Sequence, residues 1–135
     1  MKNYEILSHP ADLKIRVFGR TKQELFLNAL AAMAESMRPE VKEGAEIKRK
    51  IIVRSVDLPA LLVDFLSEIL YLSQVNKEVY DEAKFKKFSD KKIEAEVFGK
   101  KAERFNEDIK AITYHNLNIY QKKDESWEAT ILFDI

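Results

Sequence analysis

The chain has 135 residues, of which 46% are hydrophobic and 34% are charged. This size and composition predict one domain, residues 1–135, with its own buried core, and they exclude a disordered chain. The 23 basic and 23 acidic residues cancel, which disfavours a broad, free-standing nucleic-acid-binding protein, because affinity for phosphate usually comes with a basic excess. The chain contains no cysteine, so disulfides, thiolate metal sites and thiol catalysis are excluded.

No apolar run follows Met1, and no apolar stretch is expected to be long enough to cross a bilayer. We therefore expect a soluble, cytoplasmic protein without a membrane partner.

The first half of the chain predicts three strands and one helix. Alternating apolar residues predict strands at 4–7 and 13–18, on either side of the segment 8–12. The sequence Thr21-Lys22-Gln23-Glu24 matches a capping box and predicts the start of a helix that ends before Pro39. A third strand is expected at 47–54. The apolar face of the helix comprises Phe26, Ala29, Leu30, Met33 and Met37.

The second half predicts one more helix and four strands. Asp57 and Pro59 indicate the start of the helix, and its end is expected at Asn76. Strands at 79–88 and 93–98 form a hairpin, a polar loop covers 100–108, and two final strands cover 109–121 and 127–134. The predicted fold is α+β: two helices packed on a mostly antiparallel, layered sheet of about seven strands. The second helix and the last strand each have a predicted inward face. These faces comprise Leu61, Leu62, Phe65, Leu66, Ile69 and Leu72 on the helix, and Trp127, Ala129, Ile131 and Phe133 on the strand.

Polar residues gather at the ends of the predicted strands. The α-carboxylate of Ile135 adjoins the side chain of Asp134, and two carboxylates so close repel each other unless a cation or a basic group separates them. Oxygen ligands of this kind suit hard divalent cations such as Ca²⁺, Mg²⁺ or Mn²⁺. The candidate residues are His9, Asp12, Lys110, His115, Asp134 and Ile135.

Simpler interpretations of the same residues remain open at this point. In this alternative, Asp12 is an ordinary turn former, His115 is a structural histidine and Asp134 is a solvated chain end. The lysine-rich stretches at 48–50, 84–92 and 100–104 are then solvated faces. A serine hydrolase built from the segment 8–12 is disfavoured, since residues so close in sequence rarely reach triad geometry and no nucleophile elbow is present.

Four segments, taken together, resemble the archease family. Residues 4–15, with His9-Pro10-Ala11-Asp12, resemble its His-Thr-Ala-Asp signature and the strand that follows, and residues 61–71 resemble its second helix. Residues 109–116 resemble its Lys-Ala-x-Thr-Tyr-His-Gly segment, and residues 127–135 resemble its terminal Trp-x-Ala-x-x-x-x-Asp-[Ile/Val]. Pro10 stands in place of the commoner Thr and Asn116 in place of Gly, and neither change removes a presumed metal ligand.

The resemblance implies a function and a site. Archeases activate the GTP-dependent RNA ligase of tRNA splicing and RNA repair: they promote attachment of guanylate to the ligase and allow multiple turnover. It therefore implies an accessory protein and not an enzyme, with the ligase as partner and tRNA reached only through the ligase. It also implies a metal site at Asp12, Asp134 and the Ile135 carboxylate, which we expect to converge, and a functional lysine at Lys110, with His9 and His115 as further candidates.

Two other functions compete with this one. A general chaperone or modulator of RNA-modifying enzymes would bind clients through exposed apolar surface. A stand-alone metal-dependent phosphoester hydrolase is disfavoured because the candidate ligands are too few. For Lys110, a role beside phosphates and a structural salt bridge to Asp12 or Asp134 both remain open.

Overall fold

The computed structural model describes the backbone of residues 2–8 and 12–135, and the side chains of these residues except Ser8, His115 and Asn116. In this part of the chain it contains two helices and eight strands. Their order and bounds are β1 (Tyr4–Ser8), β2 (Asp12–Gly19), α1 (Lys22–Ser36), β3 (Pro39–Val41), β4 (Ile47–Arg54), α2 (Leu58–Asn76), β5 (Glu78–Phe88), β6 (Lys92–Phe105), β7 (Ala111–Gln121) and β8 (Trp127–Asp134).

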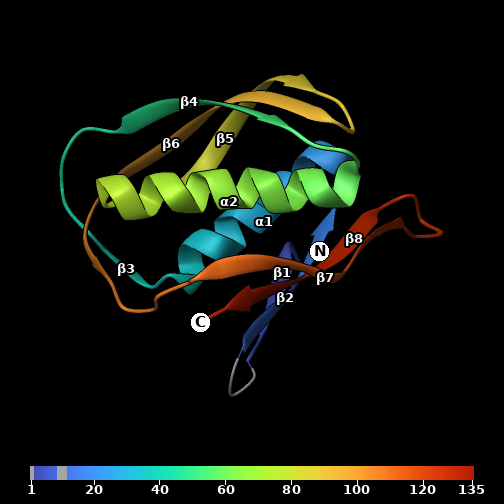
Figure 1. Ribbon diagram of the computed structural model, residues 1–135, viewed down its shortest axis with the longest axis horizontal. Coiled ribbons are helices and arrows are strands. Elements are labelled where there is room, and N and C mark those ends of the chain that lie inside the picture. Colours follow the sequence, from blue (N-terminus) through green and yellow to red (C-terminus); the bar gives the residue numbers. More distant parts are fainter. Residues whose placement is uncertain (1, 9–11) are drawn as a thin grey trace.

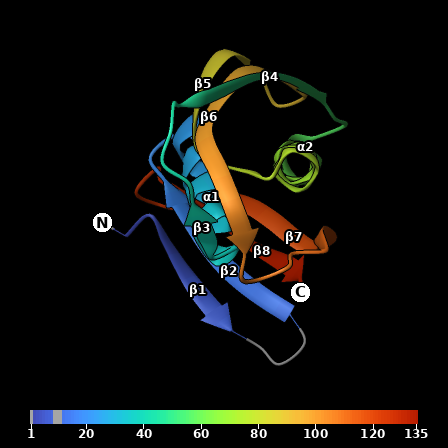
Figure 2. The ribbon, with the colours of Figure 1, turned by 90° about the vertical axis from the view of Figure 1, so that its left-hand side faces the viewer.

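The strands form two four-stranded sheets, and the helices lie between them (Figure 1). The first, which we call the terminal sheet, has the order β1-β2-β8-β7 and holds strands from both ends of the chain. The second, the central sheet, has the order β3-β6-β4, with β5 also paired to β6. Every pair is antiparallel. The view in Figure 2 shows the same arrangement, with α2 seen end-on between β4 and β7. The α+β class is thus confirmed, with two sheets in place of one.

Both helices begin where the sequence predicts. The hydroxyl of Thr21 accepts a hydrogen bond from the Glu24 amide at 3.0 Å, and the Asp57 carboxylate accepts one from the Ala60 amide at 2.9 Å. These contacts satisfy amides that have no partner inside the helix. The carboxylate of Glu24 accepts from the Arg20 amide and not from the cap residue itself. Helix α2 ends at Asn76, as predicted, and Lys77 follows in the left-handed conformation.

The strand prediction needs two corrections in the middle of the chain. Residues 100–108 were expected to be a loop, but β6 runs on to Phe105. The reason is pairing with distant segments: Lys100 and Lys101 pair with β5, and residues 102–105 pair with β3. Strand β3 itself was not predicted, and it raises the number of strands from about seven to eight. Three residues carry too little periodicity to reveal a strand from sequence.

The core lies between the two sheets. The predicted inward faces of α1, α2 and β8 are buried, and only Leu72 and Trp127 remain half-buried. Phe26 of α1 contacts Phe65 of α2 at a ring-centroid distance of 5.6 Å, and Phe88 of β5 at 5.0 Å. Such pairs add to the free energy gained by area burial alone. This aromatic contact joins both helices to the central sheet.

Helix α2 also departs from the expectation about apolar length. Its 19 residues are long and apolar enough to cross a membrane by length and composition alone. Core helices of soluble proteins meet the same criterion, and α2 buries Leu61, Leu62, Phe65, Leu66 and Ile69 completely. We therefore assign α2 to the core.

Candidate functional site

Asp12 and Asp134 lie opposite each other at the end of the terminal sheet. Asp12 is the first residue of β2, Asp134 is the last of β8, and the two are register partners in the antiparallel pair. Directly opposed residues point to the same face of a sheet, with their Cβ atoms about 4.5–5.5 Å apart. The next pair along, Leu13 and Phe133, is buried against the helices. The two aspartates therefore lie on the outer face, away from the core.

The backbone of Lys110 lies beside the same pair. Its amide donates a hydrogen bond to the Asp134 carbonyl at 2.8 Å, and Ala111, the first residue of β7, is the register partner of Asp134. One residue earlier, the carbonyl of Ile109 accepts a hydrogen bond from the Gln74 side chain of α2 at 2.9 Å. The backbone just before β7 is thus anchored to α2 through Ile109 and to β8 through Lys110. Lys110 therefore lies beside Asp134, next to Ile135.

One atom of this site has no hydrogen-bond partner among the described residues. The Oδ1 atom of Asp12 is buried, and no described residue donates a hydrogen bond to it. A buried carboxylate oxygen without a donor carries a large desolvation cost, which a cation or an ordered water would remove. Asp134 is exposed and contributes a second carboxylate, and the α-carboxylate of Ile135 follows it directly. This donor set consists of oxygen atoms alone and fits a hard divalent cation.

Among the described side chains, no three of Asp, Glu, His and Cys gather closely enough to hold a metal ion. A cation at Asp12 and Asp134 would need further ligands, and the Ile135 carboxylate and water have the right chemistry.

The ammonium group of Lys110 is exposed. In the described part of the chain its side chain makes no ion pair or hydrogen bond. The salt bridge to Asp12 or Asp134 that the sequence left open is therefore absent from these residues. The backbone of Lys110 is held in place while its charge remains available to a partner.

The two histidines are the least informative candidates. His9 lies outside the described residues, together with the rest of the turn 9–11. His115 lies within β7, between Thr113 and Asn118, where the register with β8 shifts. Its side chain, like the whole of His9, lies outside the described part of the chain.

The structure adds a contact that sequence reasoning missed. The phenol of Tyr114 in β7 donates a hydrogen bond to the Asp64 carboxylate of α2, and the hydroxyl of Ser55 donates to the same carboxylate. The hydrogen bond to Asp64, together with burial, raises the pKa of Tyr114 to about 12. This contact ties the edge strand next to His115 to α2. No sequence spacing signals it, because its three residues come from separate segments.

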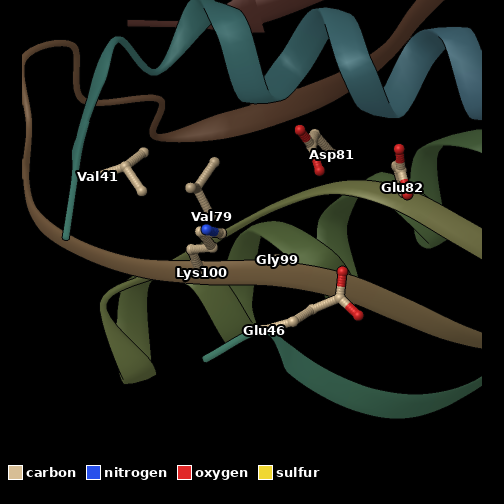
Figure 3. A pocket seen from close by; sticks show the side chains of 7 residues that line it. All are labelled: Val41, Glu46, Val79, Asp81, Glu82, Gly99 and Lys100. Carbon is tan, nitrogen blue, oxygen red and sulfur yellow. The ribbon is translucent and has the colours of Figure 1, made fainter. Parts of the chain in front are cut away.

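A surface pocket lies away from this site. It measures about 330 Å³ and contains none of the predicted site residues. In Figure 3 its side chains surround the start of β5 and the middle of β6. The lining residues are Val41, Glu46, Val79, Asp81, Glu82, Gly99 and Lys100.

Comparison with known proteins identifies a family that covers nearly the whole chain. Residues 4–135 match the Archease protein family (MTH1598/TM1083). The chain is 37% identical to the protein archease of Methanosarcina barkeri, covering 99% of this chain and 97% of that protein. It is 32% identical to the protein archease of Pyrococcus furiosus, covering all of both chains.

Two solved structures share the fold. The solution structure of Methanobacterium thermoautotrophicum protein 1598 superposes with a TM-score of 0.70 at 26% identity, over 100% of both chains. The crystal structure of an archease and possible chaperone from Thermotoga maritima gives the same TM-score of 0.70, at 18% identity, over 100% of this chain and 98% of that one. At that identity the second likeness shows the fold alone. On the family match and the curated relatives, the chain belongs to the archease family.

Proposed function

We propose that this protein activates a GTP-dependent RNA ligase in the cytoplasm, promoting guanylylation and multiple turnover of the ligase through a divalent cation. The observation that carries the proposal is the pairing of Asp12 with Asp134 at the end of the terminal sheet, with one buried Asp12 oxygen that accepts no hydrogen bond from a described residue. Asp12, Asp134 and the Ile135 carboxylate would hold Ca²⁺, Mg²⁺ or Mn²⁺.

The chemistry of guanylate transfer suits such a site. Nucleotidyl transfer requires neutralisation of phosphate charge and in-line positioning, and a bound divalent cation supplies both. The two aspartates would hold the cation on the outer face of the terminal sheet, where a partner protein can approach. The exposed ammonium of Lys110, whose backbone is fixed against Asp134, would contact phosphate oxygens. In this proposal the tRNA substrate is bound by the ligase.

A chaperone function is the second candidate, and the surface gives it less support. A client-binding surface is expected to be a contiguous apolar patch. The exposed large apolar residues of the described chain come from six segments, β1, β3, β4, α2, β7 and the turn before α2, and no one element presents more than two of them. We therefore favour the activator function over broad client binding.

The proposal is tested by ligase guanylylation with GTP, with and without this protein in substoichiometric amounts. We expect wild-type protein to stimulate the reaction and Asp12→Asn to abolish stimulation, because Asn keeps the size of Asp but lacks the charge that holds a hard cation. The matched control is Asp81→Asn, which changes an exposed aspartate on β5 and should retain full stimulation.

Three results would contradict the proposal. Full stimulation by Asp12→Asn, with an unchanged thermal melt, would make Asp12 a turn former. Hydrolysis of a phosphoester without the ligase would support a stand-alone hydrolase. Suppression of aggregation of unrelated proteins, without any effect on guanylylation, would support a chaperone.

A further inference from the structure

The fold brings two of the three lysine-rich stretches onto one surface. Strands β4 and β5 flank β6 in the central sheet, and their inward residues contact the helices. The opposite face is not covered by a helix or by the other sheet (Figures 1 and 2). We call this surface the basic face. Its charged residues are Lys48, Lys50 and Arg54 of β4, Lys92, Glu94 and Glu96 of β6, and Glu82, Lys84, Lys86 and Lys87 of β5.

The register shows how the charges are arranged. Lys50 of β4 and Lys84 of β5 are both partners of Glu96, so the three side chains form one row across the sheet. Neighbouring strands are about 4.8 Å apart, so the two rows of cations on β4 and β5 lie about 10 Å from each other. Cations outnumber carboxylates on the basic face by seven to three. Because the whole chain has no net charge, the rest of the molecule is net acidic.

The available carboxylates neutralise only part of this charge. Glu94 lies 3.3 Å from Lys87 and 3.9 Å from Lys92, and Glu96 lies 3.9 Å from Lys86. In the described part of the chain, Lys50, Lys84 and Arg54 are exposed and form no ion pair. Seven cations with three carboxylates among them leave a net positive potential on this face, which favours a bound polyanion.

An aromatic residue lies within the same surface. Phe98 of β6 is half-buried on the outer face, and the Lys48 ammonium lies 5.7 Å from the centre of its ring. Aromatic rings next to lysines are the surfaces on which proteins stack bases of single-stranded nucleic acid while cations hold its phosphates. An acidic protein surface or an anionic membrane would use the lysines but not this combination.

We propose that the basic face binds single-stranded RNA through its phosphate backbone, independently of the ligase. This goes beyond the proposed function, in which RNA is reached only through the ligase, and it rests on that function for the choice of RNA among polyanions. The lysines of β4 and β5 contact phosphates on either side of β6, and Phe98 stacks with a base. Because the chain has no net charge, its total charge does not reveal this surface.

The test measures binding of a fluorescein-labelled oligouridylate by fluorescence anisotropy over a range of salt concentrations. Wild-type protein should bind with an affinity that falls with salt, by a slope of about −0.7 in log–log form for each phosphate neutralised. The double variant Lys50→Glu/Lys84→Glu should lose at least about tenfold in affinity and show a shallower slope. The control Lys42→Glu/Lys123→Glu makes the same change of net charge at exposed lysines elsewhere, and it should lose less than about twofold.

Guanylylation without RNA separates this proposal from the proposed function. The Lys50→Glu/Lys84→Glu variant should stimulate guanylylation like the wild type, and Asp12→Asn should bind the oligouridylate like the wild type. Absence of salt-dependent binding by wild-type protein, or equal losses in both double variants, would overturn the RNA proposal. Binding to phosphatidylserine vesicles but not to the oligouridylate would overturn it in favour of a membrane. If the wild-type protein does not bind the oligouridylate and the Lys50→Glu/Lys84→Glu variant no longer stimulates RNA-free guanylylation, the RNA proposal is overturned, and the basic face is a surface that contacts the ligase.

Discussion

Glu78 is a carboxylate buried almost completely at the start of β5. It is 1% exposed, and Arg49 donates to its two oxygens from Nε and Nη2, each at 2.9 Å. The phenol of Tyr80 also donates to it, and the Lys101 ammonium lies 3.4 Å away. The hydrogen bonds from Arg49 hold the pKa of Glu78 down to about 2, although burial acts in the opposite direction. The charge at this position is therefore fully partnered.

The pKa of Glu78 predicts how stability depends on pH. Its value in the folded protein lies below its ordinary value of 4.5, so the ionised form stabilises the fold above pH 4.5. This contribution is lost as the pH falls from about 4.5 to about 2. We expect Glu78→Gln to lower the free energy of unfolding by about 1–3 kcal/mol at pH 7, and to remove this part of the acid dependence. Urea unfolding of both proteins at several pH values measures the difference.

Glu128 of the terminal sheet is a natural comparison for Glu78. It is also buried and also accepts a hydrogen bond from a phenol, that of Tyr120, but Arg16 reaches it through one nitrogen at 3.3 Å and the Lys122 ammonium lies 4.0 Å away. One longer contact with a guanidinium contributes less than a bidentate pair, so Glu128→Gln should cost less stability. The argument for Glu78 is contradicted if both variants lose the same free energy of unfolding. It is also contradicted if the difference in free energy of unfolding between wild type and Glu78→Gln stays constant from pH 7 to pH 2.

At the scale of the element, a short recurrence in the sequence has a structural counterpart. Val17-Phe18-Gly19-Arg20 recurs as Val97-Phe98-Gly99-Lys100, on β2 and β6, each an inner strand of its sheet. In both strands a cation lies over the phenylalanine ring, and the glycine meets another backbone closely. Four residues do not establish a repeat. The two strands share the same kinds of local contact.

The close approach at Gly99 predicts a large effect of one methyl group. An alanine Cβ at this position would lie 1.8 Å from the Val79 carbonyl oxygen of the neighbouring strand β5. Since that atom is backbone, β5 and β6 must separate locally, and we expect Gly99→Ala to lower the free energy of unfolding by about 3 kcal/mol. Thermal or urea unfolding measures this loss.

The control for Gly99→Ala lies on the same strand. Ala95→Gly adds no atom and should cost about 1 kcal/mol, chiefly through backbone entropy. A Gly99→Ala variant as stable as the wild type would show that β5 and β6 can part freely, contrary to their pairing along β6.

At the scale of the whole molecule, the two ends of the chain meet in one sheet. Strand β2 pairs with β8 from Asp12–Asp134 to Gly19–Trp127. A cation between Asp12, Asp134 and the Ile135 carboxylate would therefore join segments far apart in the sequence. Binding to the folded state alone stabilises it by about 2.7 kcal/mol when the ligand concentration is 100 times Kd.

This linkage predicts a thermal shift without any ligase present. Addition of Mn²⁺, Mg²⁺ or Ca²⁺ to metal-free wild-type protein should raise Tm by several degrees for at least one cation. Asp12→Asn should abolish the shift, and so should a Gly-Ser extension after Ile135, which moves the α-carboxylate away. Asp81→Asn should keep it. Equal shifts in wild type and Asp12→Asn, or no shift with any cation, would rule out this metal site.

The site illustrates what could and could not be predicted before the fold was known. The resemblance to archeases pointed to Asp12, Asp134 and Ile135, and the register places the two aspartates opposite each other. The contact of Tyr114 with Asp64, and the backbone anchors around Lys110, could not be predicted, because each joins residues from different elements. Metal binding by the three ligands stays a prediction.

The sequence by itself determined the type and inward face of most elements. Periodicity and caps are local properties, so Thr21 and Asp57 marked the helix starts, and alternation in residues 127–134 marked the buried side of β8. The tertiary structure decided what depends on partners distant in sequence. Strand β3 exists because it pairs with the end of β6, and the extension of β6 exists because it pairs with β5 and then with β3. The total charge of a chain does not depend on where its charged residues lie in space. Only the pairing of β4 and β5 with β6 brings Lys50 and Lys84 onto one face of a chain without net charge.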